Sequence, residues 1–258
     1  LLLPQDISPQ RQGIFCRSKI VLPGVPLLCY NSPNAMSIAD NLAKVRERIA
    51  AAAARAGADE AGISLIAVTK TVDVPRIQEA IEAGVTDIGE NYVQDSARKF
   101  EVVGRTVRWH MIGHLQTNKV RVAVPIFDLI QTVDGISLAN EIGKRSIAIG
   151  KTSEVLVEVN ISGEESKFGV QPDDALALCE TIAGVEGLEM RGLMGIAPFV
   201  SDEGAIRGSF RLLKGLWDKL PNVYQGWLSM GMSSDFEIAI EEGSNMVRIG
   251  TAIFGERR

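Results

Sequence analysis

Short apolar runs alternate with helical stretches along most of the chain, and this alternation restricts the possible folds more than any other feature. The runs predict strands because they are short and continuous, whereas the segments between them have helical spacing of apolar residues. Continuous apolar runs are typical of parallel strands that are buried on both faces. The eight predicted strands are Ser64–Thr69, Thr86–Gly89, Val107–Ile112, Leu129–Val133, Glu154–Ile161, Glu189–Ile196, Tyr224–Ser229 and Met246–Ile249.

Helical segments separate these strands. Several of them end at a glycine, such as Gly84 and Gly150, which is a common helix stop. A further helix precedes the first strand, with Ser37 as its N-cap and Gly57 as its stop. The predicted helices between strands are Arg76–Ala83, Val93–Val102, Ser137–Ile149, Asp173–Ala183, Ala205–Leu220 and Phe236–Glu242.

The count of strand–helix units indicates the fold class. Eight units predict an α/β fold that is a single (β/α)8 TIM barrel, here with an extra N-terminal helix. A doubly wound open sheet is the alternative, but no G-x-G-x-x-G motif follows the first strand. No linker, repeat or low-complexity stretch divides residues 36–258, so we expect them to form one domain.

The first 35 residues differ in character from the rest. They are rich in proline, have no helical period and contain Cys16 and Cys29. Their apolar piece, residues 20–28, is interrupted by Pro23 and Pro26 and is too short to span a membrane. We predict that residues 1–35 are an extraneous or disordered tail before a natural start at Met36; a genuine flexible extension is the alternative.

Composition excludes several classes of protein. The 258 residues are 46% hydrophobic and carry a formal net charge of −5, which is typical of a globular protein without the basic surface that nucleic-acid binding requires. The three cysteines have neither metal nor redox spacing, so a disulfide framework is not expected. A reducing, cytoplasmic location fits this composition.

Polar residues follow several predicted strands, where TIM barrels carry their active sites. Lys70 follows the first strand, Glu90 and Asn91 follow the second, and His110 lies near the end of the third. His110 and His114 are four residues apart, but a position between strand and loop breaks the helical spacing of a metal pair. No acidic partner completes a zinc motif, and no metal site is expected.

The segments after the last two strands resemble the phosphate-binding loops of TIM barrels in composition. A short apolar segment after the eighth strand predicts the extra helix that often accompanies such loops. Arg248, on the eighth strand, is expected to point into the barrel mouth. Hydroxyl groups and backbone N–H groups for a phosphate come from Ser229, Ser233, Ser234, Gly250 and Thr251.

Lys70 is expected beside these loops, because the eighth strand neighbours the first in a closed barrel. Burial disfavours the ammonium form and makes a lysine a better nucleophile toward an aldehyde. A lysine with a phosphate loop suits a phosphorylated aldehyde cofactor. A Schiff-base aldolase acting on a sugar phosphate is the alternative from the same residues, and a rim lysine that only extends into solvent is the structural alternative.

Five motifs occur in order along residues 36–258: "AVTKT", "IGENYVQ", "WHMIGHLQTNK", "VNISGEESKFG" and "SMGMSSDFEIAIEEGSNMVRIGTAIFG". With these motifs the chain resembles the pyridoxal phosphate homeostasis proteins (YggS/PROSC type). The resemblance implies a TIM barrel similar to the N-terminal domain of alanine racemase. It also implies a protein that binds pyridoxal 5′-phosphate and takes part in vitamin B6 homeostasis, without established turnover.

The resemblance implies a role for each site residue. Lys70 would hold pyridoxal phosphate as a Schiff base, Asn91 would lie by the ring, and His110 would be adjacent to the cofactor. Arg248 would face the pyridine nitrogen and keep it unprotonated, which weakens the electron sink that carbanion chemistry uses. The implied cofactor-binding residues are Lys70, Asn91, Ser229, Met230, Arg248, Gly250 and Thr251, with Ser229, Gly250 and Thr251 at the phosphate.

Two functions remain open at this point. The implied function is a carrier that buffers pyridoxal phosphate or delivers it to apo-enzymes, with effects on amino-acid pools. The alternative is a pyridoxal phosphate-dependent enzyme of the alanine racemase and decarboxylase fold type acting on an unidentified amino acid. The racemases use a second domain and a partner-subunit tyrosine, and none of Tyr30, Tyr92 and Tyr224 is a counterpart. We therefore expect a monomer with negligible racemase activity.

Overall fold

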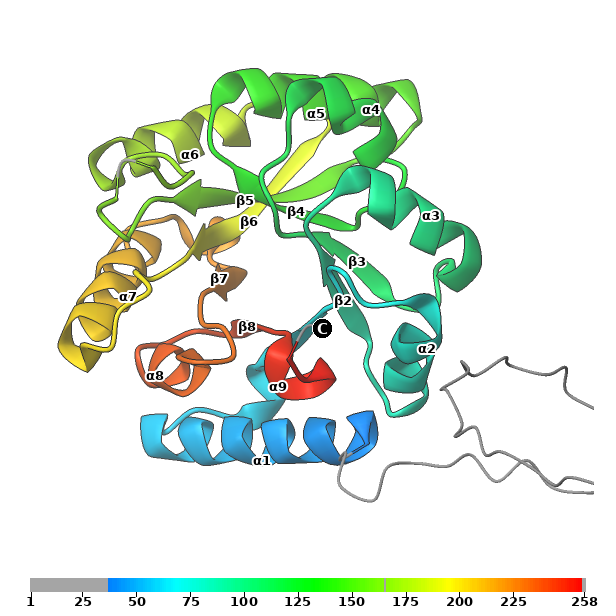
Figure 1. Ribbon diagram of the computed structural model, residues 1–258. Coiled ribbons are helices and arrows are strands. Elements are labelled where there is room, and N and C mark those ends of the chain that lie inside the picture. Colours follow the sequence, from blue (N-terminus) through cyan, green and yellow to red (C-terminus); the bar gives the residue numbers. More distant parts are fainter. Residues whose placement is uncertain (1–36, 165, 257–258) are drawn as a thin grey trace, which may run out of the picture. The chain divides into compact units, whose positions relative to one another are not determined.

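Eight parallel strands close into a barrel in the computed structural model, which describes residues 37–164 and 166–256 (Figure 1). Each strand pairs with the next along the chain, and the first pairs with the last, which confirms the predicted (β/α)8 barrel. The predicted tail, residues 1–35, and the predicted start at Met36 lie outside the described residues. The strands are β1 (Ser64–Val68), β2 (Asp87–Glu90), β3 (Arg108–Met111), β4 (Leu129–Val133), β5 (Ser153–Val159), β6 (Leu188–Gly195), β7 (Trp227–Ser229) and β8 (Met246–Ile249).

Helices lie outside the ring of strands (Figure 1). Short 3₁₀ turns add to them at Glu60–Gly62, Thr117–Lys119, Pro172–Asp174 and Asn222–Tyr224. The helices are α1 (Ile38–Ala56), α2 (Val74–Glu82), α3 (Val93–Val103), α4 (Val120–Ala123), α5 (Ile136–Ala148), α6 (Ala175–Ala183), α7 (Glu203–Trp217), α8 (Phe236–Glu241) and α9 (Thr251–Phe254).

Some element boundaries differ from the sequence prediction. The sequence does not predict α4, a single turn within "VRVAV", because β-branched residues have low helix propensity. The predicted start of the seventh strand at Tyr224 is wrong, since this residue ends the 3₁₀ turn Asn222–Tyr224 and β7 begins at Trp227. The predicted helix Asp173–Ala183 begins as a 3₁₀ turn before α6.

The N-terminal helix α1 begins and ends as its sequence predicts. Ser37 Oγ accepts a hydrogen bond from the Asp40 N–H (3.1 Å), and the Asp40 carboxylate accepts one from the Ser37 N–H (3.2 Å). Gly57 ends the helix with a φ of 65°. Figure 1 shows α1 beside α8 and α9, where Asn41 Nδ2 donates to the Ile253 carbonyl (3.0 Å). The extra N-terminal helix is therefore part of the barrel's outer layer.

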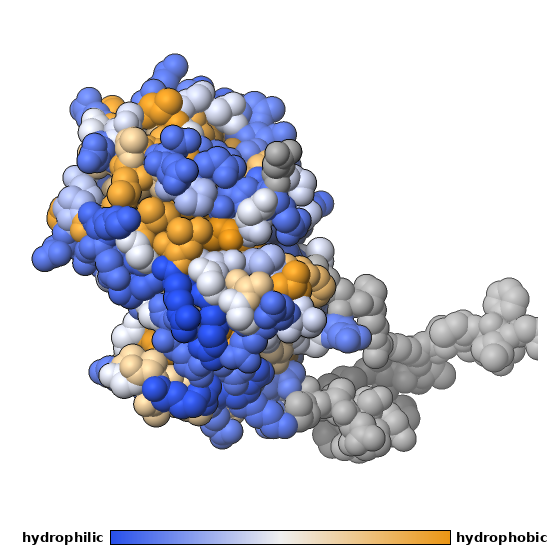
Figure 2. All heavy atoms as spheres, turned by 90° about the vertical axis from the view of Figure 1, so that its left-hand side faces the viewer, coloured by the Kyte–Doolittle hydropathy of each residue, from blue (hydrophilic) through white to orange (hydrophobic). Residues whose placement is uncertain are grey.

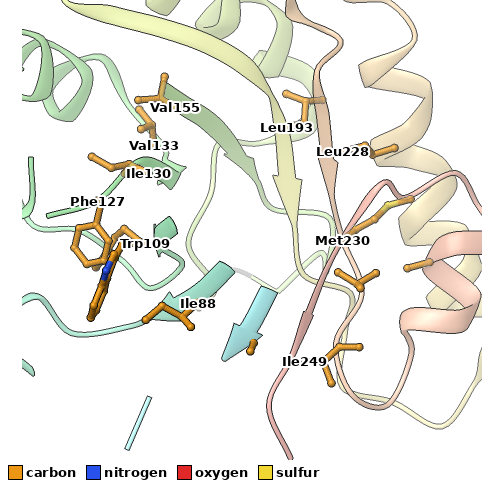
Figure 3. Close-up of a cluster of buried hydrophobic side chains, with 14 of the residues drawn as sticks. Ile88, Trp109, Phe127, Ile130, Val133, Val155, Leu193, Leu228, Met230 and Ile249 are labelled. Atoms are coloured by element: carbon orange, nitrogen blue, oxygen red, sulfur yellow. The ribbon is translucent and has the colours of Figure 1, made fainter. Parts of the chain in front are cut away.

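Strand residues alternate between two hydrophobic layers. Outward-facing side chains such as Ile88, Trp109, Ile130 and Val155 form the larger core with the helices (Figure 3). The barrel interior contains a much smaller apolar cluster, formed by Ile66, Leu129, Leu156, Met194 and Met246. Polar side chains therefore occupy much of the rest of the interior, and they form the candidate site described below.

Hydrophilic residues cover most of the side of the barrel shown in Figure 2, and hydrophobic residues gather in one area of it. Helix α7 has one apolar face and one charged face. It buries Phe210 and Leu213, while Arg207 and Arg211 form ion pairs with Glu242. Within the described ranges, no helix is both long enough and apolar enough to cross a lipid bilayer.

Candidate functional site

Lys70 lies on a tight turn directly after β1, at the carboxyl end of the barrel as the sequence predicts. The Val72 N–H donates to the Thr69 carbonyl (2.9 Å) and closes the turn. Thr71 has a φ of 65°, which costs a β-branched residue about 1–2 kcal/mol. Surrounding contacts must therefore hold the turn in this conformation. Lys70 itself is half-buried.

A buried ion pair anchors this turn from outside the strand ring. Lys99 Nζ, on α3, donates to Glu90 Oε1 (2.7 Å) and to the Thr69 carbonyl (2.8 Å). Thr69 Oγ1 donates to the same Glu90 oxygen (2.6 Å). Burial raises the pKa of Glu90, although the hydrogen bonds from Lys99 and Thr69 lower it. The Glu90 carboxylate thus stabilises the turn instead of facing the barrel mouth. The role of Lys99 is not evident from the sequence pattern.

The loops after β7 and β8 meet around the Ser233 hydroxyl group. Ser233 Oγ accepts hydrogen bonds from the N–H groups of Gly250 (3.2 Å) and Ala252 (3.4 Å). The N–H groups of Ser233, Ser234 and Thr251 donate to no acceptor within the described residues. Converging N–H groups of this kind bind anions. Because α9 is a single turn, its dipole would add little to the binding of an anion.

Strand pairing brings Lys70 beside these loops. Ala67 on β1 pairs with Ile249 on β8, and a Cβ atom on Gly250 would lie 3.4 Å from Val68 Cβ. Lys70 follows Val68 by two residues. Lys70 and the loops after β7 and β8 therefore lie next to each other, although they come from opposite ends of the described chain.

A chain of hydrogen bonds crosses the barrel interior from Arg248 on β8 to Asp87 on β2. Arg248 Nη1 donates to Ser229 Oγ (2.6 Å), and Ser229 Oγ donates to Gln131 Oε1 (2.6 Å). Gln131 Nε2 donates to His110 Nδ1 (3.0 Å), which leaves His110 Nε2 to donate to Asp87 Oδ1 (2.9 Å). All donors point in one direction, from the cation to the anion, so each bond polarises the next.

This chain holds Arg248 in one place. Its Nη2 also donates to the Gly195 carbonyl (2.9 Å), and burial lowers its pKa to about 10 against the opposing charges of Asp235 and Glu158. At the other end, burial alone would raise the pKa of Asp87, but hydrogen bonds from His110 and Thr86 hold it below its usual value. Hydrogen bonds thus fix the position of the Arg248 guanidinium group, although burial disfavours its charge.

The side chains of Ser229 and Met230 are both engaged within the fold. The Ser229 hydroxyl group both accepts and donates within the interior chain, so Ser233 supplies the hydroxyl between the two loops. Met230 is fully buried in the outer hydrophobic core (Figure 3). Only its backbone can contact a ligand in the barrel mouth.

Asn91 lies at the same end of the barrel, after β2. Its Oδ1 atom is buried and has no hydrogen-bond partner among the described residues. The neighbouring Gly113 permits this packing, since a Cβ atom there would lie 2.6 Å from the Asn91 carbonyl oxygen. Asn91 therefore presents an unsatisfied polar group of the kind that a ligand completes.

The two histidines are separated by the end of β3. His110 is buried in the barrel interior, whereas His114 lies in the following loop and stacks on Phe168 with ring centroids 3.9 Å apart. His114 Nδ1 also lies 3.6 Å from Asp134 Oδ2. The two histidines therefore do not share a helix face.

Glu158 and Gln131 are not predicted from the sequence, but both are polar groups of the barrel interior. Glu158 is buried on β5, and burial together with Asp134 raises its pKa to about 7, while Arg248 opposes that shift. The signal in the sequence is a polar residue inside an apolar run, as in "VLVEVNI" and "LIQTV". Such a residue marks the inward face of a barrel strand.

One surface hollow lies away from this site. Its volume is about 670 Å³, and it is lined by residues of α5, α6 and the loop after α6, including Ile136, Lys144 and Val185. None of the predicted site residues lines it. The chemistry of the chain is concentrated at the carboxyl ends of the strands instead.

Sequence comparison places the chain among known proteins. Residues 40–258 match the family model for the N-terminal domain of alanine racemase. The pyridoxal phosphate homeostasis proteins of Aquifex aeolicus and Escherichia coli K12 are 42% and 43% identical to the chain, over 86% and 85% of its length and 100% and 97% of theirs. The chain belongs to the pyridoxal phosphate homeostasis protein family. The family that the five motifs indicate is thus confirmed.

A solved structure of this homeostasis family has the same fold. PipY of Synechococcus elongatus PCC7942, with pyridoxal phosphate bound, is 30% identical and has a TM-score of 0.73. The match covers 85% of the present chain and 100% of the PipY chain. A TIM barrel related to the N-terminal domain of alanine racemase is therefore the fold of this family member.

Proposed function

We propose that this family member binds pyridoxal phosphate on Lys70 and buffers or delivers it within the cell. The observation that supports this most directly is the meeting of the Lys70 turn with the loops after β7 and β8 at one end of the barrel. An aldehyde with a phosphate needs an amine and several N–H donors, and the site contains both. PipY, its 30% identical relative, has pyridoxal phosphate bound.

The residues at the two ends of the ligand have separate roles. Lys70 Nζ would hold the aldehyde carbon covalently, and the aldehyde oxygen would leave as water. The N–H groups of Ser233, Ser234 and Thr251, which have no acceptor among the described residues, would bind the phosphate. Asn91, whose Oδ1 atom has no partner among the described residues, lies beside the ring.

Arg248 determines what the bound ligand can do. A guanidinium group has only donors, so it binds the pyridine nitrogen through that nitrogen's lone pair and leaves the nitrogen unprotonated. Pyridoxal phosphate supplies an electron-withdrawing ring, and an unprotonated ring withdraws electrons weakly. The hydrogen-bond chain to Asp87 keeps the guanidinium group in position. This arrangement favours holding the cofactor over carbanion chemistry.

The covalent assignment is tested by reduction with borohydride. The full chain is incubated with pyridoxal phosphate, reduced, digested and mapped by mass spectrometry. We expect a pyridoxyl adduct on the peptide containing Lys70, no adduct there in Lys70→Ala, and full labelling in Lys144→Ala, whose lysine is exposed on α5. An adduct located mainly at another lysine would overturn the assignment.

Carrier and enzyme functions are separated by a second experiment. The loaded protein is incubated with a panel of amino acids and keto acids, and separately with an apo-enzyme that requires pyridoxal phosphate. We expect transfer of the cofactor to the apo-enzyme without product from the panel. Sustained product formation would instead identify an enzyme acting on an amino acid. A cytoplasmic monomer is part of the same proposal, and sedimentation velocity tests its oligomeric state.

A further inference from the structure

Two carboxyl groups lie side by side at the carboxyl ends of β4 and β5. Val133 pairs with Val157, and both valines face the outer hydrophobic core. Glu158 follows Val157 on β5 and therefore faces the barrel interior. Asp134 directly follows the last residue of β4 and is close enough to Glu158 to raise the pKa of Glu158. Leu156, which belongs to the interior cluster, gives the same direction for β5.

One oxygen of this pair is buried without a partner. Glu158 is only 6% exposed, and its Oε2 atom accepts no hydrogen bond from the described residues. Arg248 lies close enough to affect Glu158 electrostatically, but its Nη1 and Nη2 atoms donate to Ser229 and to the Gly195 carbonyl. A buried acceptor without a donor is costly unless a ligand supplies the donor.

We propose that Glu158 and Asp134 form a subsite for the ammonium group of a primary amine at the barrel mouth. This inference rests on the proposed function, because primary amines are the ligands that react with an aldehyde held on Lys70. An ammonium group has three donors and no acceptor, which matches an acidic pair with an unsatisfied oxygen. The subsite therefore recognises amino acids and other primary amines by their charge.

Glu158 also accepts a proton from such a ligand. The ammonium group gives one proton to the Glu158 carboxylate, which becomes a neutral carboxyl group, and the amine keeps the lone pair that makes it a nucleophile. A carboxyl group with a pKa of about 7 performs this exchange near neutral pH. The charged groups that face Glu158 are Asp134 from the end of β4 and Arg248 from β8, and His114 lies against Asp134.

Calorimetry on the full chain without added pyridoxal phosphate tests the subsite. Glycinamide is titrated at pH 8, with acetamide as the probe that lacks an ammonium group. We expect wild type to bind glycinamide and not acetamide, and Glu158→Gln to raise the dissociation constant for glycinamide at least tenfold. The matched control is Glu164→Gln, an exposed carboxylate in the loop after β5, which should bind like wild type.

Asp134→Asn is a second variant that keeps the test decisive if Glu158→Gln folds poorly. It should also weaken glycinamide binding, and thermal unfolding confirms that each variant is folded. Equal binding of glycinamide by wild type and either folded variant, or no preference over acetamide in wild type, overturns the subsite. Because no cofactor is added, these results do not depend on whether Lys70 carries pyridoxal phosphate, which the borohydride experiment tests separately.

Discussion

Thr71 holds a backbone conformation that suits glycine better than a β-branched residue, directly beside Lys70. We expect Thr71→Gly to raise the free energy of unfolding by about 1 kcal/mol, because the exposed side chain loses few contacts and the left-handed strain disappears. Urea denaturation measures the change. Thr152→Gly, at an exposed position without a positive φ, should instead lower stability. A Thr71→Gly variant less stable than wild type would show that the side chain supports the turn.

Glu158 should make stability depend on pH. Its pKa is about 7 in the folded protein and about 4.5 when unperturbed. Between these values the folded state keeps a proton that the unfolded state loses, so stability falls as pH rises from about 4.5 to about 7. The full loss, of order 3 kcal/mol, is present above pH 7.

We therefore expect Glu158→Gln to remove this loss. Its free energy of unfolding should exceed that of wild type at pH 8 and differ little from it at pH 5, as measured by urea denaturation at both values. Glu164→Gln serves as the control, since this carboxylate is exposed. If the free energy of unfolding had the same pH dependence in wild type and Glu158→Gln, the folded protein would not shift the pKa of this carboxyl group.

The positions of some site residues can be predicted from the sequence, whereas those of others cannot. Lys70 and Arg248 are predictable because they end or lie on recognisable strands, and a barrel places such positions at its mouth. Lys99 is not, because its role depends on a contact between α3 and the end of β1. The outward direction of the Met230 side chain follows from strand alternation, because Leu228 two residues earlier also faces the outer core.

At the scale of elements, Gln131 joins strands that are far apart around the barrel. It links His110 on β3 to Ser229 on β7. Gln131→Leu would leave both of these buried polar groups without their partner, and we expect a loss of about 2–4 kcal/mol in the free energy of unfolding. Urea denaturation checks this, with the exposed Gln116→Leu as control. A loss below 1 kcal/mol would indicate that water replaces the amide.

The number and type of the strands follow from the sequence, whereas several boundaries do not. Continuous apolar runs identify all eight strands because both faces of a barrel strand are buried. Boundaries depend on hydrogen bonds that form only in the fold, such as the 3₁₀ bond from the Gln225 N–H to the Asn222 carbonyl that delays β7. The interior hydrogen-bond chain is likewise a property of assembled strands rather than of any one of them.

At the scale of the whole molecule, ion pairs join α1, α7 and α8 on the outside of the barrel. Arg207 on α7 donates to Glu241 (2.6 Å) and to Glu242 (3.0 Å), and Arg55 on α1 also donates to Glu241 (2.6 Å). Hydrogen bonds from Arg207 and Arg55 lower the pKa of Glu241. The network links the N-terminal helix to the last third of the barrel.

We expect Arg207→Gln to lower the free energy of unfolding by about 1 kcal/mol in low salt and by less in 1 M sodium chloride, because salt screens partly exposed charges. Urea denaturation at both salt concentrations measures the difference. Arg121→Gln is the control, since Arg121 is exposed and has no ion pair among the described residues. An effect of equal size in both salts would assign the loss to packing of the arginine stem.

The pairing of β1 with β8 has a consequence for how the protein is made. Lys70 leaves the ribosome early, whereas Gly250 and Thr251 are among the last described residues to be synthesised. The site cannot exist until the final strand has reached the first, a contact of very long sequence separation. A chain in which β8 has not yet paired with β1 therefore cannot capture a reactive aldehyde at the proposed site, and uptake of the cofactor there marks a chain in which the barrel has closed.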